Sequence, residues 1–238
     1  MVDAQVVKDL TGLKLNREQK EFLEGKKGGA AQTSMRILAA LAGIYNAKRL
    51  VPVSSAQIAG VSYHNIGSAG LQWLEDMARD GKAMVKATLN PAGMDLRQWK
   101  KLGIRKSFAE KQIRVVKAFT RMGVKPTLTC TPYLVGNKPR KGEHVAWAES
   151  SAVCYANSVL GARTNREGGP SALASALTGY TPEYGMHLAE NRQAKARVLV
   201  EAKLENTADY RSFLYLFNRH HVGRWCGGFN YPADCRTV

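Results

Sequence analysis

The sequence has no apolar run that approaches the roughly 20 residues needed to cross a bilayer. Its first residues also lack the apolar region of a secretory signal peptide. A membrane-spanning protein is therefore not expected, and the cytoplasm is the expected location. Neither the glycine-rich motif of a nucleotide-binding turn nor the nucleophile elbow of a hydrolase occurs.

Cysteine is scarce, with Cys130, Cys154, Cys226 and Cys235 as the only four. They are too few and too widely spaced for a disulfide framework, and Cys226 and Cys235 lack the spacing of a zinc site. Cys154 falls at an apolar position of a predicted helix, which indicates a small core residue. Cys130 lies between two threonines at a predicted strand end. On these grounds it is most simply a buried structural residue, although a thiolate there could also project into a cleft.

Acidic residues are few as well: 19 Asp and Glu against 35 Lys and Arg leave a net charge of +16. Such a charge favours an anionic partner, whether nucleic acid, a membrane surface, an acidic subunit or a small metabolite. The basic residues are dispersed in short clusters such as Lys100-Lys101, with no recognisable nucleic-acid module. A basic nucleic-acid-binding protein is therefore the non-enzyme alternative.

Helix and strand patterns alternate along the chain. Apolar spacing predicts helices within residues 15–49, 71–81 and 108–122, and strands over 50–53, 83–89 and 124–129. This alternation predicts an α/β fold with a parallel or mixed sheet and flanking helices. Polar segments at 54–67, 90–93 and 130–133 each follow a predicted strand. Because ligands collect at the carboxyl ends of parallel strands, we expect these segments to converge there.

The segment from His144 to Pro170 combines polar and apolar side chains. Apolar spacing predicts a helix over 148–160 that begins with Glu149, Ser150 and Ser151, where exposed N–H groups can hold an anion. Arg163 and Arg166 follow, and paired guanidiniums suit carboxylate or phosphate recognition. The simpler alternative is a capped helix followed by a solvated basic loop. A helix-like stretch that includes His187 and Arg192 is predicted to present a solvated face.

Taken in order, several motifs resemble the large subunit of the aconitase X family. They are Ser55-Ala-Gln-Ile-Ala-Gly-Val-Ser-Tyr63, Asn65-Ile-Gly67 with Ala69-Gly70, Thr88-Leu-Asn-Pro-Ala-Gly93, Thr129-Cys-Thr-Pro-Tyr133, Trp147-Ala-Glu-Ser-Ser-Ala152 and Ala156-Asn-Ser-Val-Leu-Gly-Ala-Arg-Thr-Asn-Arg-Glu-Gly-Gly-Pro170. The resemblance covers roughly residues 15 to 210 and is specific, because the motifs occur in the family's order. Within the family, the Asn-Pro-Ala-Gly and Thr-Asn-Arg-Glu-Gly-Gly-Pro forms look most like its archaeal-type members.

The resemblance implies an aconitase-like fold and a hydro-lyase that converts (R)-5-phosphomevalonate to trans-anhydromevalonate 5-phosphate in a modified mevalonate route to isoprenoids. The alternative on the same fold is dehydration of cis-3-hydroxy-L-proline. The implied cofactor is an iron–sulfur cluster of the 4Fe-4S type, acting as a Lewis acid. The implied partner is a small subunit, which forms a heterodimer with the large subunit and supplies the general base.

The same resemblance implies roles for individual residues. It makes Cys130 a cluster ligand, with the remaining ligands not found in this chain. The implied substrate contacts are Gly60, Val61, Ser62, Asn90, Pro91, Glu149 and Ser150, with Arg163 and Arg166 as further candidates for the substrate's negative charge.

The resemblance ends near Arg211. Residues 1–210 are therefore expected to form part of an aconitase X catalytic domain, and residues 211–238 a divergent tail. The family's large subunit continues further, so a truncation or a reading-frame shift is expected, and the chain is expected to be an incomplete large subunit.

Overall fold

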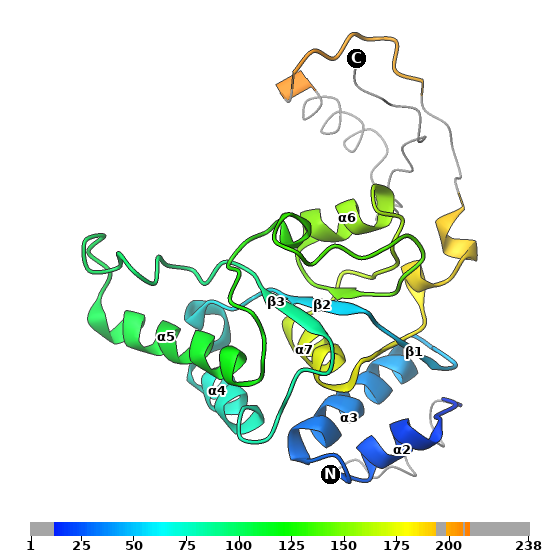
Figure 1. The fold of residues 1–238 in the computed structure, drawn as a ribbon, viewed down its shortest axis with the longest axis horizontal. Helices are drawn as coiled ribbons and strands as arrows, with labels where there is room; N and C mark the ends of the chain where they lie inside the picture. The colour runs from blue at the N-terminus through cyan, green and yellow to red at the C-terminus, as the bar shows by residue number, and fades with distance from the viewer. Residues whose placement is uncertain (1–11, 194–198, 207, 210–238) are drawn as a thin grey trace.

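A computed structural model describes residues 12–193, 199–206 and 208–209 (Figure 1). The predicted tail at 211–238, with Cys226 and Cys235, lies outside these residues. The helices are α2 (Arg17–Leu23), α3 (Gly29–Ile44), α4 (Tyr63–Met77), α5 (Lys106–Arg121), α6 (Ser150–Ser158) and α7 (Gly169–Thr178), with 3-10 turns at Pro132–Leu134, Gly185–His187 and Glu190–Arg192. Among the described residues, no helix is long and apolar enough to span a membrane.

A three-stranded parallel sheet lies at the centre of the fold. Its order is β3 (Lys86–Leu89), β2 (Ser55–Ile58) and β4 (Ala146–Trp147). The middle strand β2 is buried along its whole length. Parallel bridges of Thr88 with Lys125 and of Trp147 with Arg166 extend the pairing on both sides. The predicted α/β architecture with parallel strands is confirmed.

Helices cover both faces of this sheet (Figure 1). On one face, α4, α5 and α7 bury a core with β2 and β3 that includes Ile58, Leu89 and Leu173. On the other face, α6 packs over β4 around Trp147, which is completely buried. Burial of apolar area at about 25 cal/mol per Å² makes these two cores the main source of stability.

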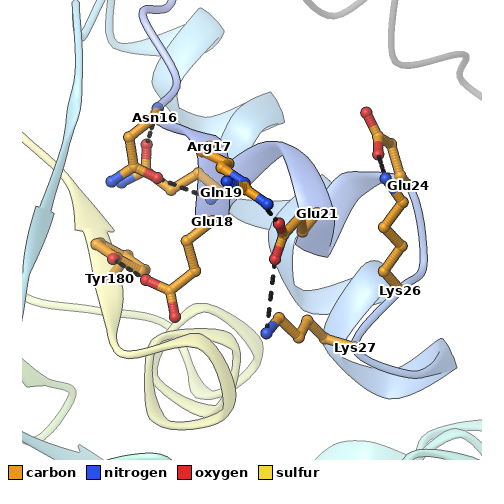
Figure 2. Close-up of polar contacts among 9 residues, drawn as sticks. All are labelled: Asn16, Arg17, Glu18, Gln19, Glu21, Glu24, Lys26, Lys27 and Tyr180. Atoms are coloured by element: carbon orange, nitrogen blue, oxygen red, sulfur yellow. Dashed lines mark hydrogen bonds and ion pairs between the residues drawn. The ribbon is translucent and has the colours of Figure 1, made fainter.

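A second small sheet joins the N-terminal helices to the rest. Strands β1 (Leu50–Pro52) and β5 (Tyr180–Pro182) pair antiparallel, and α2 and α3 pack beside them. Figure 2 shows how α2 begins: Asn16 and Gln19 exchange side-chain to backbone hydrogen bonds of 2.8 and 3.0 Å, which satisfies two otherwise unpaired N–H groups. Tyr180 of β5 donates to Glu18 at 2.6 Å and fastens α2 to this sheet.

Two of the predicted segments are wrong. The predicted loop at 54–67 contains β2 and the start of α4, so that only Ser54 and residues 59–62 lie outside them. The predicted strand at 124–129 forms no more than the single bridge at Lys125. Pro126 has no N–H to donate to a ladder, and Leu128 has a φ of 52°, which lies outside the extended region.

The predicted solvated face at His187 and Arg192 is also wrong. His187 is completely buried, with its Nδ1 atom 2.8 Å from Nδ1 of His144. Arg192 is partly buried and donates to the side-chain oxygen of Asn157 at 2.7 Å. Burial, followed by the neighbouring His144, lowers the pKa of His187 to about 3.

We expect the stability of the protein to fall in acid because of His187. The unfolded imidazole has a pKa near 6.5, so the unfolded state binds the extra proton between pH 6.5 and about 3. The contribution of His187 to the free energy of unfolding is fully present above about pH 6.5. Below that pH the free energy of unfolding falls by about 1.4 kcal/mol per pH unit. Denaturant unfolding at pH 7, 6 and 5 should show this slope and a shallower one for His187→Phe. A matched control, His64→Gln, alters an exposed histidine and should keep the full slope; an unchanged slope in His187→Phe would contradict the assignment.

Candidate functional site

Three loops leave the carboxyl ends of the parallel strands at the same edge of the sheet. Residues 59–62 follow β2, 90–93 follow β3, and 148–149 follow β4 and lead into the first turn of α6. Asn90 donates its N–H to the carbonyl of Ile58 at 2.9 Å, which holds the ends of β3 and β2 together. This geometry brings the predicted substrate residues to one place: Gly60, Val61, Ser62, Asn90, Pro91, Glu149 and Ser150.

Two buried glutamines hold these loops. Gln57, in the middle of β2, accepts hydrogen bonds from the backbone N–H groups of Ala148 and Glu149 at 3.2 and 2.8 Å. Its amide nitrogen lies 3.3 Å from Oδ1 of Asn90. Gln112 of α5 accepts from the N–H of Tyr63 at 2.7 Å and donates to the carbonyl of Val61 at 2.9 Å.

Sequence reasoning did not identify either glutamine. A signal was present in β2, where Gln57 interrupts an otherwise apolar run from Ala56 to Ala59. A polar residue that is buried inside a strand needs hydrogen-bond partners, and those of Gln57 lie in the loops of the site. For Gln112 the helical pattern alone gives no such signal.

Val61 and Ser62 face different surroundings. The Val61 side chain is buried in the core, so this residue can reach a ligand only through its backbone. The Ser62 side chain is half-buried and lies against Gly93 of the neighbouring loop. A Cβ atom at Gly93 would lie 2.8 Å from Oγ of Ser62, and Gly93 has a φ of +74°.

We expect Gly93→Ala to displace Ser62. The positive φ should cost about 1–2 kcal/mol of stability, and the clash should turn the Ser62 hydroxyl away from its present position. Gly103→Ala is a matched control, because Gly103 has a φ of +67° with nothing within 4 Å of its added Cβ. Both variants should lose similar stability in denaturant unfolding. Only Gly93→Ala should weaken ligand binding, and equal binding by both would contradict a role for Ser62.

Glu149 caps the N-terminus of α6. Its carboxylate accepts from the N–H of Ala152 at 2.9 Å and from the hydroxyls of Ser151 and Ser150 at 2.5 and 3.3 Å. Burial opposes the charge, but these hydrogen bonds outweigh it and hold the pKa of Glu149 below its usual value. A carboxylate offers about four acceptor positions, so Glu149 can still accept from a ligand hydroxyl.

Cys130 is exposed beside this carboxylate, which corrects the expectation of a buried structural cysteine. The hydroxyls of Thr129 and Thr131, on either side of Cys130, hydrogen-bond each other at 3.0 Å. Partial burial, and then the negative charge of Glu149, raise the pKa of the Cys130 thiol. Cys154, expected in the core, is exposed on α6 instead.

The donor set for a cluster is incomplete in the described part of the chain. Cys130 offers one accessible sulfur at the open edge, which fits one ligand of an iron–sulfur cluster. The described residues contain no group of three or more Cys, His, Asp or Glu side chains able to hold a metal. The described residues therefore fit one ligand of an iron–sulfur cluster, Cys130, and do not supply the other ligands.

The two predicted arginines lie at opposite ends of β4. Arg163 pairs with His144, before the strand, and its guanidinium donates to the carbonyl of His187 at 2.9 Å. Arg166 pairs with Trp147 at the carboxyl end. Its side chain is exposed and makes no hydrogen bond or ion pair with the residues that the structure describes. Of the two arginines, only Arg166 therefore lies where it could bind an anion at the loops that follow the strands.

A basic hollow lies at the other end of the sheet. It has a volume of about 230 Å³ and is lined by Ser54, Lys86, Lys138, Arg140 and Glu143, among others. Ser54 and Glu143 already hydrogen-bond each other at 2.9 Å across it. Because ligands of parallel α/β sheets bind at the carboxyl ends of the strands, we assign the candidate site to the loops and not to this hollow.

Comparison with known proteins gives consistent matches. The family model described as "Aconitase X first domain" matches residues 12–190. The phosphomevalonate dehydratase large subunit of Methanothermobacter thermautotrophicus is 57% identical over 203 residues, which are 85% of this chain and 51% of that protein. The cis-3-hydroxy-L-proline dehydratase of Hypocrea jecorina is 39% identical over 217 residues, 90% of this chain and 36% of that protein.

A solved structure agrees with these matches. The crystal structure of Thermococcus kodakaraensis aconitase X in its holo-form superposes with a TM-score of 0.78 at 49% identity, covering 87% of this chain and 52% of that one. The chain spans about half the length of the large subunits that it matches. The fold is thus aconitase-like, and the chain belongs to the aconitase X family.

Proposed function

We propose that this chain is part of the large subunit of a hydro-lyase that dehydrates (R)-5-phosphomevalonate to trans-anhydromevalonate 5-phosphate. The pathway would be a modified mevalonate route to isoprenoids. The observation that carries the proposal is the 57% identity to a phosphomevalonate dehydratase large subunit. The gathering of Asn90, Glu149 and Cys130 at one open edge of the sheet is consistent with it.

The proposed substrate site consists of the three loops. Gly60, Val61, Ser62, Asn90, Pro91, Glu149 and Ser150 would contact the substrate. Asn90 and Ser150 can donate hydrogen bonds to anionic oxygens, and Glu149 can accept from a hydroxyl. The exposed Arg166 would attract the phosphate or carboxylate of the substrate, whereas the guanidinium of Arg163 already donates to the carbonyl of His187. Residues 1–210 would form part of the catalytic domain.

An iron–sulfur cluster of the 4Fe-4S type and a small subunit belong to the same proposal. When bound, such a cluster would supply Lewis-acid chemistry at the departing hydroxyl, and Cys130 would hold it from this chain. The name "large subunit" carried by the relatives supports a small-subunit partner in a heterodimer. That partner would supply the general base.

The alternative is dehydration of cis-3-hydroxy-L-proline, favoured by the relative that is 39% identical. The two substrates differ in the phosphate. The complete enzyme that contains this chain, prepared anaerobically with its small subunit, should be incubated with each substrate and the products identified by NMR. We expect turnover of phosphomevalonate with kcat/KM at least ~100-fold higher, since a lost charged contact costs about 3 kcal/mol. Preference for hydroxyproline, or turnover of neither, would refute the proposal.

A further inference from the structure

Gln57 is a polar side chain in the middle strand of the sheet, which is buried along its whole length. It has no exposed surface, and burying an amide without partners costs about 1–3 kcal/mol. All of its side-chain hydrogen bonds among the described residues go to the loops of the candidate site, namely to Ala148 and Glu149 on one side and Asn90 on the other. The residue therefore connects the loop after β3 with the loop after β4.

The orientation of the Gln57 amide follows from its partners. The backbone N–H groups of Ala148 and Glu149 can only donate, so Oε1 of Gln57 must face them. Its NH2 group then faces Asn90, which must present its oxygen in return. The NH2 group of Asn90 is consequently turned away from Gln57, and it makes no hydrogen bond with any residue that the structure describes.

We propose that Gln57 is a positioning residue that fixes the amide of Asn90 with its NH2 group toward the ligand. The loop after β3 thereby offers a donor and selects a ligand with an anionic acceptor oxygen, a carboxylate or a phosphate. The same side chain holds the backbone of Glu149, so that the acceptor at Glu149 and the donor at Asn90 keep a fixed separation. This inference rests on the proposed function for the identity of the ligand.

The Gln57→Glu substitution tests the orientation. The new carboxylate still accepts from Ala148 and Glu149, but it cannot donate to Asn90, whose amide must turn and present its oxygen to the ligand. In the complete enzyme we expect KM for phosphomevalonate to rise ~10- to 100-fold at pH 8 with a smaller change in kcat, because repulsion replaces a charged hydrogen bond worth about 1.5–3 kcal/mol.

Lowering the pH separates positioning from a purely structural effect. A buried carboxyl is readily protonated, and its O–H can again donate to Asn90. KM of Gln57→Glu should therefore improve relative to the unaltered enzyme between pH 8 and 6. Gln57→Met, which is similar in size but has neither a donor nor a titratable group, should show no such recovery. A KM that does not change with pH in Gln57→Glu, or equal recovery in Gln57→Met, would overturn the inference.

A second measurement requires neither turnover nor the Gln57 variant. Titration of the asparagine-labelled, unaltered complete enzyme with phosphomevalonate should shift the side-chain NH2 resonance of Asn90, and Asn90→Asp should weaken binding ~10-fold or more. If the resonance does not move although the ligand binds, the inference fails. If phosphomevalonate is neither bound nor dehydrated, titration with inorganic phosphate should shift the Asn90 NH2 resonance instead. The absence of a shift with inorganic phosphate would then overturn the inference. The proposed function is tested separately: it fails if the unaltered enzyme does not dehydrate phosphomevalonate.

Discussion

Replacing Cys130 with serine should lower kcat of the complete enzyme by at least ~1000-fold and remove most of its iron–sulfur absorbance. Lewis-acid assistance supplies several kcal/mol to such reactions, and each 1.36 kcal/mol corresponds to tenfold in rate. Serine keeps the size of the side chain and the hydrogen bonds of Thr129 and Thr131 around it. The loss would therefore come from the sulfur itself.

Two features of the structure support this expectation. Cys130 is exposed and lies near Glu149 of the candidate site, so that its sulfur is accessible. The pKa of its thiol is raised by partial burial and by Glu149, so a bound metal ion would have to displace the thiol proton.

Cys154→Ser is the matched control for this prediction. Cys154 is also exposed, but it lies on α6, beyond the first turn that borders the site. Anaerobic iron and sulfide analysis with steady-state rates should show normal values for this variant. Full iron content and activity in Cys130→Ser would show that Cys130 is not a ligand.

Glu149→Gln should reduce kcat/KM by ~100-fold while changing stability by no more than about 1 kcal/mol. The amide oxygen can still cap α6 by accepting from Ala152, so that only the charge–dipole part of the cap is lost. The negative charge proposed to accept the substrate hydroxyl is removed, and a hydrogen bond to a charged group is worth about 1.5–3 kcal/mol.

The same variant should lower the pKa of Cys130, because the charge of Glu149 is one of the causes that raise it. The rate of alkylation by iodoacetamide, followed against pH in cluster-free protein, measures this pKa directly. Glu143→Gln removes a carboxylate at the opposite end of the sheet and should leave the pKa of Cys130 unchanged. A pKa of Cys130 that stays the same in Glu149→Gln would mean that the two groups do not interact.

Much of the fold could be predicted because its signals are local. The helix α5 shows buried residues such as Val115 and Phe119 at helical spacing, and the alternation of apolar residues near β3 predicts a strand. Of the three segments expected to converge, only 90–93 follows a strand of the parallel sheet as predicted. The strand expected before 54–67 is β1 of the antiparallel pair, and the one expected before 130–133 is no more than a bridge at Lys125. The strand β2 was missed because Ser55 and Gln57 are polar, and their burial depends on partners far away in the sequence.

Other features depend on tertiary contacts that no local pattern contains. His187 is buried and contacts His144, which lies 43 residues away in the sequence. Arg163 and Arg166 look equivalent in the sequence, yet they lie in an extended segment beside β4. Since a strand rises about 3.3 Å per residue, three residues separate them by roughly 10 Å and leave only Arg166 at the candidate site.

The most direct test of this account is a crystal structure of the complete enzyme with (R)-5-phosphomevalonate bound. We predict the substrate at the carboxyl ends of β2, β3 and β4, with an anionic oxygen within hydrogen-bond distance of the Asn90 side chain and its hydroxyl directed to Glu149. Substrate bound instead in the basic hollow formed by Lys86, Lys138 and Arg140, with the loops empty, would contradict the assignment of the site.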